Sequence, residues 1–419
     1  MIKKIFSNLN LLLLSLTALV LPWQSKLILR PAASNYWEIA LFVGFFCSWL
    51  SLLVLALNRF NKKEVAGTSL KLLYGAAGLS VISGLVSVFL SVDPVLSFFR
   101  WTLWLAALVF FIFLRNSHQL WRRRLALILL FSLIVQAFFG LFQFFTQTSW
   151  ASSYLGVAYH SAADLGASVI ETSDGRWLRA YGASDHPNIF GGLMSLAAIG
   201  SLYFFLQESR RYWRLVFLGF YIIFLTAVFT SFSRAAMLAL FVGLIILFWE
   251  RRFWIKENLR LFTALALLSV LVFGIFAQSY RPLLLARGQI NNRLEKISLA
   301  ERSELNTQAW RDFKLSPWFG VGLGASTLFN WQIDKNANQV RPAWYYQPAH
   351  NYWLLAAAEG GIFFISAVVF LWFLAYQKSR KHRLLGLFFA FFVLTLFDHW
   401  LFSLPLSALW IFFLLALIW

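Results

Sequence analysis

The hydrophobic residues of this 419-residue chain fall into long continuous runs, which short clusters of polar and basic residues separate. A helix that crosses a bilayer needs roughly 17–25 predominantly apolar residues. We therefore expect an all-α integral membrane protein in which residues 1–419 form a single polytopic domain. The runs predict about 12 transmembrane helices, at residues 7–23, 37–57, 72–91, 98–114, 125–146, 188–206, 215–231, 235–249, 261–278, 351–376, 384–400 and 403–418. Only a short break near Asp398–Pro405 separates the last two runs.

The composition agrees with a membrane protein and excludes several other classes. Hydrophobic residues make up 60% of the chain and charged residues 13%, whereas soluble domains have about 45–50% and about 25%. The single cysteine, Cys47, excludes an internal disulfide and a CxxC-type site. His160 and Asp164 are close in sequence, but two such residues are weak evidence for a metal site. We expect no metal and no cofactor.

The basic residues predict the orientation in the membrane. With the N-terminus in the cytoplasm, 21 of the 36 Lys and Arg residues fall at cytoplasmic breaks, and six fall on the outer side outside the longest loop. Because cytoplasmic loops carry an excess of Lys and Arg, both termini are expected to be cytoplasmic. The first run lacks a convincing cleavage site, so it is expected to remain as a span. The net charge of +19 is then an effect of orientation, and nucleic-acid binding is not expected.

Two long outer loops, at about 147–187 and 279–350, hold the candidate functional residues. The first loop contains Arg179 and ends in the sequence His186-Pro-Asn, directly before a predicted span. Both Arg179 and His186 are candidates for function. His186 could equally be a capping residue, because this sequence is also typical of a helix start.

Arg234 lies between two apolar runs that leave almost no loop to bring it into water. A charge at this place usually pairs with another group or faces a polar cavity. The small neighbours Ser233 and Ala235 permit close approach of helices, which favours an inward position for Arg234. The alternative is that its side chain reaches the outer headgroups.

The longest outer loop has apolar residues at helical spacing between residues 289 and 314, with charged residues between them. This pattern predicts one or two helices at the outer surface, with Ser303 and Asn306 near a helix start. The loop carries nine basic and five acidic residues, and most of them are expected to form a solvated helix face.

Three alternate glycines follow in the same loop, at Gly320, Gly322 and Gly324. Exposed backbone amides in such a turn can bind a phosphate oxygen, although glycine turns are common. The loop ends at His350, which is the best candidate for a base because a neutral imidazole can accept a proton near neutral pH. The alternative is an interfacial cap. Glu359 is expected partway along the next span, with either a functional or a helix-pairing role.

The order of these motifs resembles the O-antigen ligase family of bacterial membrane glycosyltransferases. The resemblance extends over roughly residues 179–361 and includes the outer-loop arginine, the His-Pro-Asn sequence, the Ser-x-Ser-Arg-Ala turn, the alternate glycines, and a His-Asn pair followed by Glu-x-Gly. It implies a GT-C-like fold with a large helical periplasmic loop. It also implies an active site on the periplasmic face of the bacterial inner (cytoplasmic) membrane.

The resemblance further implies an inverting, metal-independent transfer of a glycan from undecaprenyl pyrophosphate to a sugar hydroxyl of lipid A–core, as in lipopolysaccharide assembly. His350 would be the catalytic base, and Arg234, Arg302 and Arg179 would bind the pyrophosphate. Arg293 and Arg311 are close enough in sequence to Arg302 to be alternatives. The supporting residues would be His186, Asn351, Glu359, Gly320 and Gly322.

Two alternative functions stay open at this stage. An O-antigen or polysaccharide polymerase, or a protein O-oligosaccharyltransferase, would use the same donor with another acceptor. A non-catalytic transporter belongs to a different class, but such carriers are expected to have matched internal repeats, and none is convincing in this chain. Lipid-linked glycan, a glycan acceptor and membrane lipids are therefore the expected partners.

Overall fold

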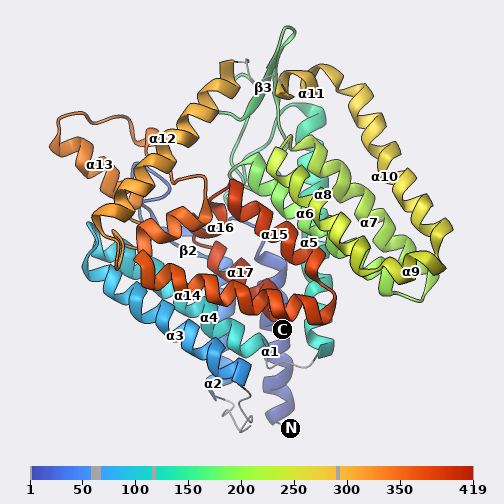
Figure 1. Cartoon of the computed structure of the whole chain (residues 1–419), viewed down its shortest axis with the longest axis horizontal. Helices are drawn as coiled ribbons and strands as arrows, with labels where there is room; N and C mark the ends of the chain where they lie inside the picture. Colours follow the sequence, from blue (N-terminus) through green and yellow to red (C-terminus); the bar gives the residue numbers. More distant parts are fainter. Residues whose placement is uncertain (1, 58–67, 116–118, 289–292, 419) are drawn as a thin grey trace.

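The computed structural model describes residues 2–57, 68–115, 119–288 and 293–418. Within these ranges every predicted apolar run contains a helix (Figure 1), and the all-helical class is confirmed. The corresponding helices are α1 (Ile2–Val20), α2 (Val43–Leu57), α3 (Thr68–Phe89), α4 (Pro94–Arg115), α5 (Gln119–Thr146), α6 (Pro187–Gln207), α7 (Arg211–Thr230), α8 (Arg234–Glu250), α10 (Leu259–Ser279), α14 (Tyr352–His382), α15 (Leu385–Phe397) and α17 (Ser407–Ile418).

Seven of the described helices are long and apolar enough to cross a membrane, namely α3, α4, α5, α6, α7, α10 and α14. Others are apolar but shorter: α15 has 13 residues and α17 has 12. Between them lie Asp398 and the four-residue helix α16 (Trp400–Ser403). The structure is thus that of a helical membrane protein, and the number of 12 spans stays a prediction.

The helix α6 is the most buried of the seven long apolar helices, and α10 lies at the edge of the molecule (Figure 1). In the apolar windows of these helices, 83% of α6 is buried but only 11% of α10. Glycines let the neighbours of α6 approach closely. A Cβ on Gly191 would lie 2.4 Å from the Ser231 Oγ at the end of α7, and a Cβ on Gly243 of α8 would lie 2.3 Å from Ile199 Cδ1. Small residues at such crossings are what tight packing between membrane helices requires.

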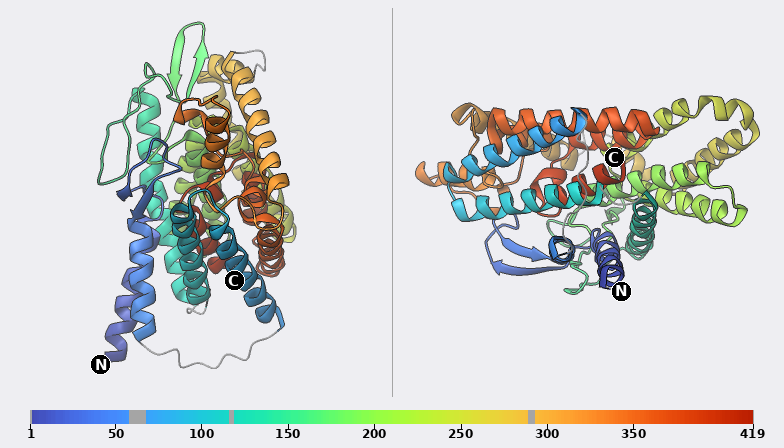
Figure 2. Two further views of the ribbon diagram at one scale, coloured as in Figure 1. Left: turned by 90° about the vertical axis from the view of Figure 1, so that its left-hand side faces the viewer. Right: turned by 90° about the horizontal axis from the view of Figure 1, so that it is seen from below.

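The loops that were predicted to be outer gather at one end of the molecule, with the N-terminus at the other end (Figures 1 and 2). The loop at 147–187 contains an antiparallel hairpin of β3 (Val169–Thr172) and β4 (Gly175–Leu178). A second small sheet pairs β1 (Lys26–Arg30) with β2 (Ile39–Phe42). Neither sheet was expected, because such short strands hold too few residues for a recognisable alternation.

The loop at 279–350 is largely helical, as the amphipathic pattern predicted. It contains α11 (Arg281–Gly288), α12 (Arg293–Leu315), α13 (Ser326–Asn336) and a short 3₁₀ helix (Ala343–Tyr345). The expectation that Ser303 and Asn306 lie near a helix start is wrong, because both are inside the continuous helix α12. Ile290, which belonged to the predicted amphipathic face, lies outside the described residues. The remaining short helix, α9 (Arg252–Glu257), follows α8.

The helix α14 is interrupted at Gly361, whose φ of 71° and ψ of −174° are not helical. Glu359 lies partway along α14, as the sequence predicted, but the break at Gly361, two residues further on, was not expected. The break opens the backbone around Glu359, Gly360 and Gly361 to a neighbouring loop, and that loop is the glycine-rich segment after α12.

Candidate functional site

His350 lies directly before α14, and its position is fixed by the cap of that helix. The Asn351 side chain accepts a hydrogen bond of 2.9 Å from the Leu354 amide and so caps α14, which places the preceding residue beside the helix entrance. The His350 side chain is 18% exposed. Burial lowers its pKa, the carboxylate of Asp398 opposes this shift, and the charge of Arg302 adds to it. The imidazole is therefore neutral near pH 7 and can accept a proton.

Asp398 faces His350 from the end of α15. Its Oδ1 lies 3.8 Å from the His350 Nδ1, so an ion pair forms if the imidazole becomes protonated. The carboxylate is buried, and it accepts hydrogen bonds from Asn188 Nδ2 at 3.1 Å and from the His399 amide at 2.8 Å. Asp398 was noted in the sequence only as part of a break between spans. A lone carboxylate between two apolar runs was the signal that could have identified it.

His350, Asp398 and His399 are the described residues that could hold a metal ion, because their ligand atoms lie within 4.8 Å of one another. Most of these atoms already have partners within the protein. Both oxygens of Asp398 accept hydrogen bonds, and the His399 Nδ1 lies 2.6 Å from the Ser403 Oγ. The His350 Nδ1, by contrast, is buried and has no hydrogen-bond partner among the described residues. Since zinc sites use at least three protein ligands, this arrangement fits a proton acceptor better than a metal centre.

Arg179 is 3% exposed and holds three segments together. Its guanidinium donates hydrogen bonds to the Ser231 carbonyl at 2.7 Å, to Ser168 Oγ at 2.8 Å and to Asn188 Oδ1 at 2.8 Å. These three hydrogen bonds use three of the five N–H donors of the guanidinium, so direct binding of pyrophosphate by Arg179 stays a prediction. Through Asn188, Arg179 also positions Asp398 and, beyond it, His350.

His186 is the N-cap of α6, as the alternative interpretation held. Its Nδ1 accepts a hydrogen bond of 3.1 Å from the Asn188 amide, and Pro187 occupies the first helical position. Burial lowers the pKa of His186 well below its usual value, and the charge of Arg179 lowers it further. A neutral imidazole is what a cap acceptor requires, so the structure gives His186 a supporting role.

Arg234 is the first residue of α8, after a tight turn in which Phe232 has a left-handed φ of 47°. Its guanidinium pairs with Glu295 Oε2 at 2.7 Å, and the side chain remains 45% exposed. Arg287 of α11 pairs with the other oxygen of Glu295. Sequence analysis missed both Glu295 and Arg287. Nothing in their local sequence distinguishes them from a solvated helix face, because the partner that draws Glu295 inward, Arg234, is 61 residues away.

Arg302 of α12 has free hydrogen-bonding capacity, because its buried Nε has no partner among the described residues. Of the sequence alternatives, Arg293 pairs with Glu171 at 3.0 Å, and Arg311 pairs with Asn330 although its own Nε also lacks a partner among these residues. Arg302 is distinguished from both by its proximity to Asp398 and Arg234. Burial lowers the pKa of Arg302, while Asp398 raises it and Arg234 lowers it, so these groups share one electrostatic environment.

Four arginines thus gather at one end of the bundle, namely Arg179, Arg234, Arg287 and Arg302. Burial lowers the pKa of Arg287 to about 8, and the charges of the other three lower it in turn. Such a concentration of positive charge is costly unless an anion neutralises it. We call these residues the arginine cluster. Its position beside His350 and Asp398 makes this end of the molecule the candidate active site.

The glycine-rich loop does not present free amides to a ligand, which corrects the phosphate interpretation of Gly320 and Gly322. The Gly320 amide donates to the Ser316 carbonyl at 2.9 Å, and the Gly322 amide donates to the Glu359 carbonyl at 3.1 Å. The Gly324 amide donates to the Glu359 carboxylate at 2.6 Å. Glu359 therefore fixes this loop against the break in α14, and the glycines permit the close contact between the two backbones.

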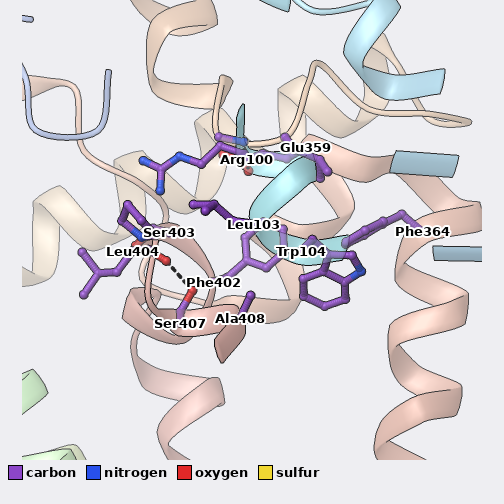
Figure 3. A pocket seen from close by; sticks show the side chains of 13 residues that line it. Arg100, Leu103, Trp104, Glu359, Phe364, Phe402, Ser403, Leu404, Ser407 and Ala408 are labelled. Carbon is purple, nitrogen blue, oxygen red and sulfur yellow. Dashed lines mark hydrogen bonds between the residues drawn. The ribbon is translucent and has the colours of Figure 1, made fainter. Parts of the chain in front are cut away.

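A cavity of about 40 Å³ lies beside this contact, between Arg100 of α4 and the segment from Phe402 to Ala408 (Figure 3). Arg100 donates to the Tyr36 carbonyl at 3.2 Å, but its buried Nε and Nη1 have no partner among the described residues. The volume is enough to hold water, since one water needs roughly 10–15 Å³ by such a measure. The cavity is lined by a buried arginine whose hydrogen bonds within the protein are incomplete, and it is separate from the arginine cluster.

The comparison with known protein families agrees with the motif resemblance. Residues 219–369 match a family model described as O-antigen ligase. The match includes Arg234, Arg302 and His350, whereas Arg179 and Asp398 lie outside it. No curated protein matches the chain. Over this part of the chain, the match confirms the predicted resemblance to the O-antigen ligase family.

Proposed function

We propose that this chain is a glycosyltransferase of the O-antigen ligase family in the bacterial inner membrane. It would transfer a glycan from undecaprenyl pyrophosphate to a sugar hydroxyl of lipid A–core on the periplasmic face. The observation that carries the proposal is the arginine cluster beside His350. A dianionic leaving group and a hydroxyl nucleophile need these two chemical elements next to each other.

The location of the site within the membrane protein supports an outer face. The site lies where α6, α8 and α14 begin, and their opposite ends carry the basic clusters that favour the cytoplasm. A substrate with a polyprenyl tail can reach such a membrane-edge site by lateral diffusion, with its diphosphate at headgroup level.

The donor pyrophosphate would be bound chiefly by Arg234 and Arg302. Arg234 is the more exposed of the two, and its pairing with Glu295 orients the guanidinium. Arg302 brings a buried nitrogen without a partner. Planar guanidinium groups pair with phosphate oxygens through two parallel hydrogen bonds, and they stabilise the charge that develops as the glycosidic bond breaks.

The acceptor hydroxyl would lose its proton to His350. In one displacement, the acceptor oxygen forms a bond to the anomeric carbon while the bond from that carbon to the pyrophosphate oxygen breaks. The proton passes to His350. Undecaprenyl pyrophosphate leaves, and the arginines pair with its negative charge. Attack from the face opposite the leaving group inverts the anomeric configuration. Asp398 stabilises the imidazolium that forms, because its carboxylate lies 3.8 Å away.

The test uses purified protein in liposomes with an undecaprenyl-pyrophosphate glycan, in the presence of EDTA. One reaction contains lipid A–core and a second contains only more donor, and the products are separated on a gel. A new band that needs lipid A–core supports the ligase. A ladder of products without lipid A–core identifies a polymerase instead. The absence of product in both reactions would contradict both the ligase and the polymerase. Glycan transfer to a protein acceptor and transport would then remain as the alternative functions.

A further inference from the structure

A cavity opens at the end of the helices opposite the arginine cluster. Its volume is about 580 Å³, within the roughly 300–1,000 Å³ that small-molecule sites occupy. The walls are almost entirely aliphatic and aromatic, and they come from α5, α6, α8, α15 and α17. They include Leu129, Leu133, Ala197, Leu247, Trp410 and Leu414.

The ends of the helices place this cavity at the predicted cytoplasmic side. It is lined by Gln207 at the end of α6 and by His382 at the end of α14, whereas the candidate active site lies at the start of both helices. The 21 residues of α6 extend over about 31 Å at 1.5 Å per residue. This distance matches a hydrocarbon core of about 30 Å. The cavity therefore opens at the end of α6 opposite the active site and extends past the middle of that helix, as far as Leu193.

The mouth of the cavity is basic. Arg122 and Arg123 of α5 and His382 of α14 all line it. Arg123 is paired with Glu208 at 3.2 Å, but the Arg122 Nε is buried and has no hydrogen-bond partner among the described residues. Among the described residues that line the cavity there is no Asp or Glu, so its lining supplies no acidic group to balance these arginines.

We propose that this cavity binds one anionic phospholipid of the cytoplasmic leaflet. One acyl chain fills the apolar interior, and the phosphate pairs with Arg122 at the mouth. Basic pockets between transmembrane helices on the cytoplasmic side are suited to anionic headgroups. The inference depends on the predicted orientation in the membrane, but it does not depend on the proposed glycosyl transfer.

The chemistry distinguishes this occupant from neutral lipids. An aliphatic chain alone would satisfy the walls but would leave the buried Arg122 nitrogen without an acceptor, which costs free energy. A phosphate supplies both the acceptor and the negative charge that the mouth lacks. A soluble anion would satisfy the mouth but would leave the apolar interior empty. A phosphate that is covalently joined to an acyl chain satisfies both parts.

The experiment measures lipid retention by native mass spectrometry. The detergent-purified chain is mixed with phosphatidylglycerol or phosphatidylethanolamine of identical acyl chains. We expect one tightly held phosphatidylglycerol per chain and at least about tenfold weaker retention of phosphatidylethanolamine. Arg122→Gln should lower phosphatidylglycerol affinity about tenfold, the effect of losing a charge-assisted hydrogen bond. Arg124→Gln is the matched control, because Arg124 is exposed on the same helix and does not line the cavity.

A second pair of variants tests the cavity itself. Gly200 lines the cavity, and a Cβ there would meet only Leu130 Cδ2 at 3.7 Å, an ordinary contact. Gly200→Leu should therefore fold and should abolish retention of the lipid. Gly219→Leu on α7 is the control, since a Cβ there meets nothing within 4 Å. Equal retention of both lipids by the wild type, or unchanged retention in either Arg122→Gln or Gly200→Leu, would overturn the proposal.

Discussion

At the scale of single residues, the chemistry depends on one imidazole that is kept neutral and unpaired. Replacing His350 with alanine should lower the rate of transfer by roughly 10²–10⁴-fold, the usual contribution of a general base. Expression and thermal stability should stay close to wild type, because the His350 Nδ1 makes no hydrogen bond that the fold would lose. Turnover in liposomes and thermal unfolding measure the two effects.

The matched control for His350 is His160→Ala, because His160 also lies in an outer loop but stacks on Tyr181 with 4.0 Å between ring centroids. This variant should retain its transfer rate. Wild-type turnover by a folded His350→Ala protein would remove the base assignment.

The geometry of the guanidinium should matter as much as its charge at Arg234. Arg234→Lys keeps the charge but loses the planar fork, which can hold Glu295 and a phosphate oxygen at once. We expect at least about a tenfold loss of kcat/KM. The comparison variant is Arg293→Lys, in which the replaced arginine is exposed and pairs only with Glu171 among the contacts described. Full activity of Arg234→Lys would mean that the side chain only anchors at the headgroups.

The pH dependence of kcat/KM should reveal which neighbouring residues shift the pKa of His350. Burial lowers its pKa below the usual 6.5, so kcat/KM should hold as the pH falls to about 6.5 and decline below that value. Asp398 raises this pKa and Arg302 lowers it. Asp398→Asn should therefore move the acid limb to lower pH, whereas Arg302→Gln should move it to higher pH.

The pH profiles of kcat/KM for these two variants separate a shift in the pKa of His350 from partial unfolding. A variant that merely unfolds lowers the maximum of kcat/KM but does not change the pH at which kcat/KM declines. Shifts in the same direction for both variants would contradict the electrostatic arrangement of Asp398 and Arg302 around His350.

At the scale of secondary-structure elements, the break in α14 is the feature that connects the outer loop to the bundle. Gly361 has a φ of 71°, and a Cβ there would lie 2.3 Å from the backbone carbon of Trp318. Gly361→Ala should therefore lower the free energy of unfolding by more than about 1 kcal/mol, because alanine does not fit this backbone conformation. A lower apparent Tm of the detergent-purified protein measures this loss. Gly274→Ala in α10 is the control, since a Cβ there meets nothing within 4 Å and it lies inside a regular helix.

An unchanged apparent Tm in Gly361→Ala would mean that the loop can shift away from α14 at no cost. Loss of activity together with the lowered Tm would further connect the glycine-rich loop to the position of His350, because both flank the first part of α14.

The helices were predictable from the sequence because burial in a bilayer demands long apolar runs. Each run of the analysis contains a helix of the structure, α6 and α10 among them. The break at Gly361 was not predictable, since a single Glu-Gly-Gly sequence also occurs in continuous helices. The two hairpins were missed because strands of four or five residues carry little periodicity.

The functional roles of His350, Arg234 and Arg302 stay predictions, but the structure brings these three residues to one end of the bundle. Arg234 stood out in the sequence because almost no loop brings it into water, whereas Arg302 was chosen only through the family resemblance. Sequence analysis missed residues whose role depends on a distant partner. The role of Arg179 as a positioning residue depends on Asn188 and Ser231, and that of Glu295 on Arg234, which is 61 residues away. Such contacts are set by packing, which one sequence without relatives does not reveal.

At the scale of the whole molecule, both proposals depend on which end of the bundle faces the cytoplasm. The arginine cluster and the lipid cavity are at opposite ends, so inverting the protein would place pyrophosphate chemistry at the wrong membrane surface. The positive-inside bias of 21 basic residues to six favours the orientation used here. Labelling of single cysteines in cells can test this orientation directly.

The chain is well suited to cysteine labelling, because Cys47 is its only cysteine and is buried. In a Cys47→Ala background, Tyr154→Cys would report on the predicted outer loop and Tyr212→Cys on the predicted cytoplasmic end of α7, where the native side chains are 90% and 70% exposed. A membrane-impermeant maleimide added to cells with a permeabilised outer membrane should label position 154 only. Both positions should react once the inner membrane is opened, which controls for accessibility. Labelling of position 212 alone in cells with a sealed inner membrane would invert the topology. It would then separate the arginine cluster from any periplasmic acceptor and remove the basis of both proposals.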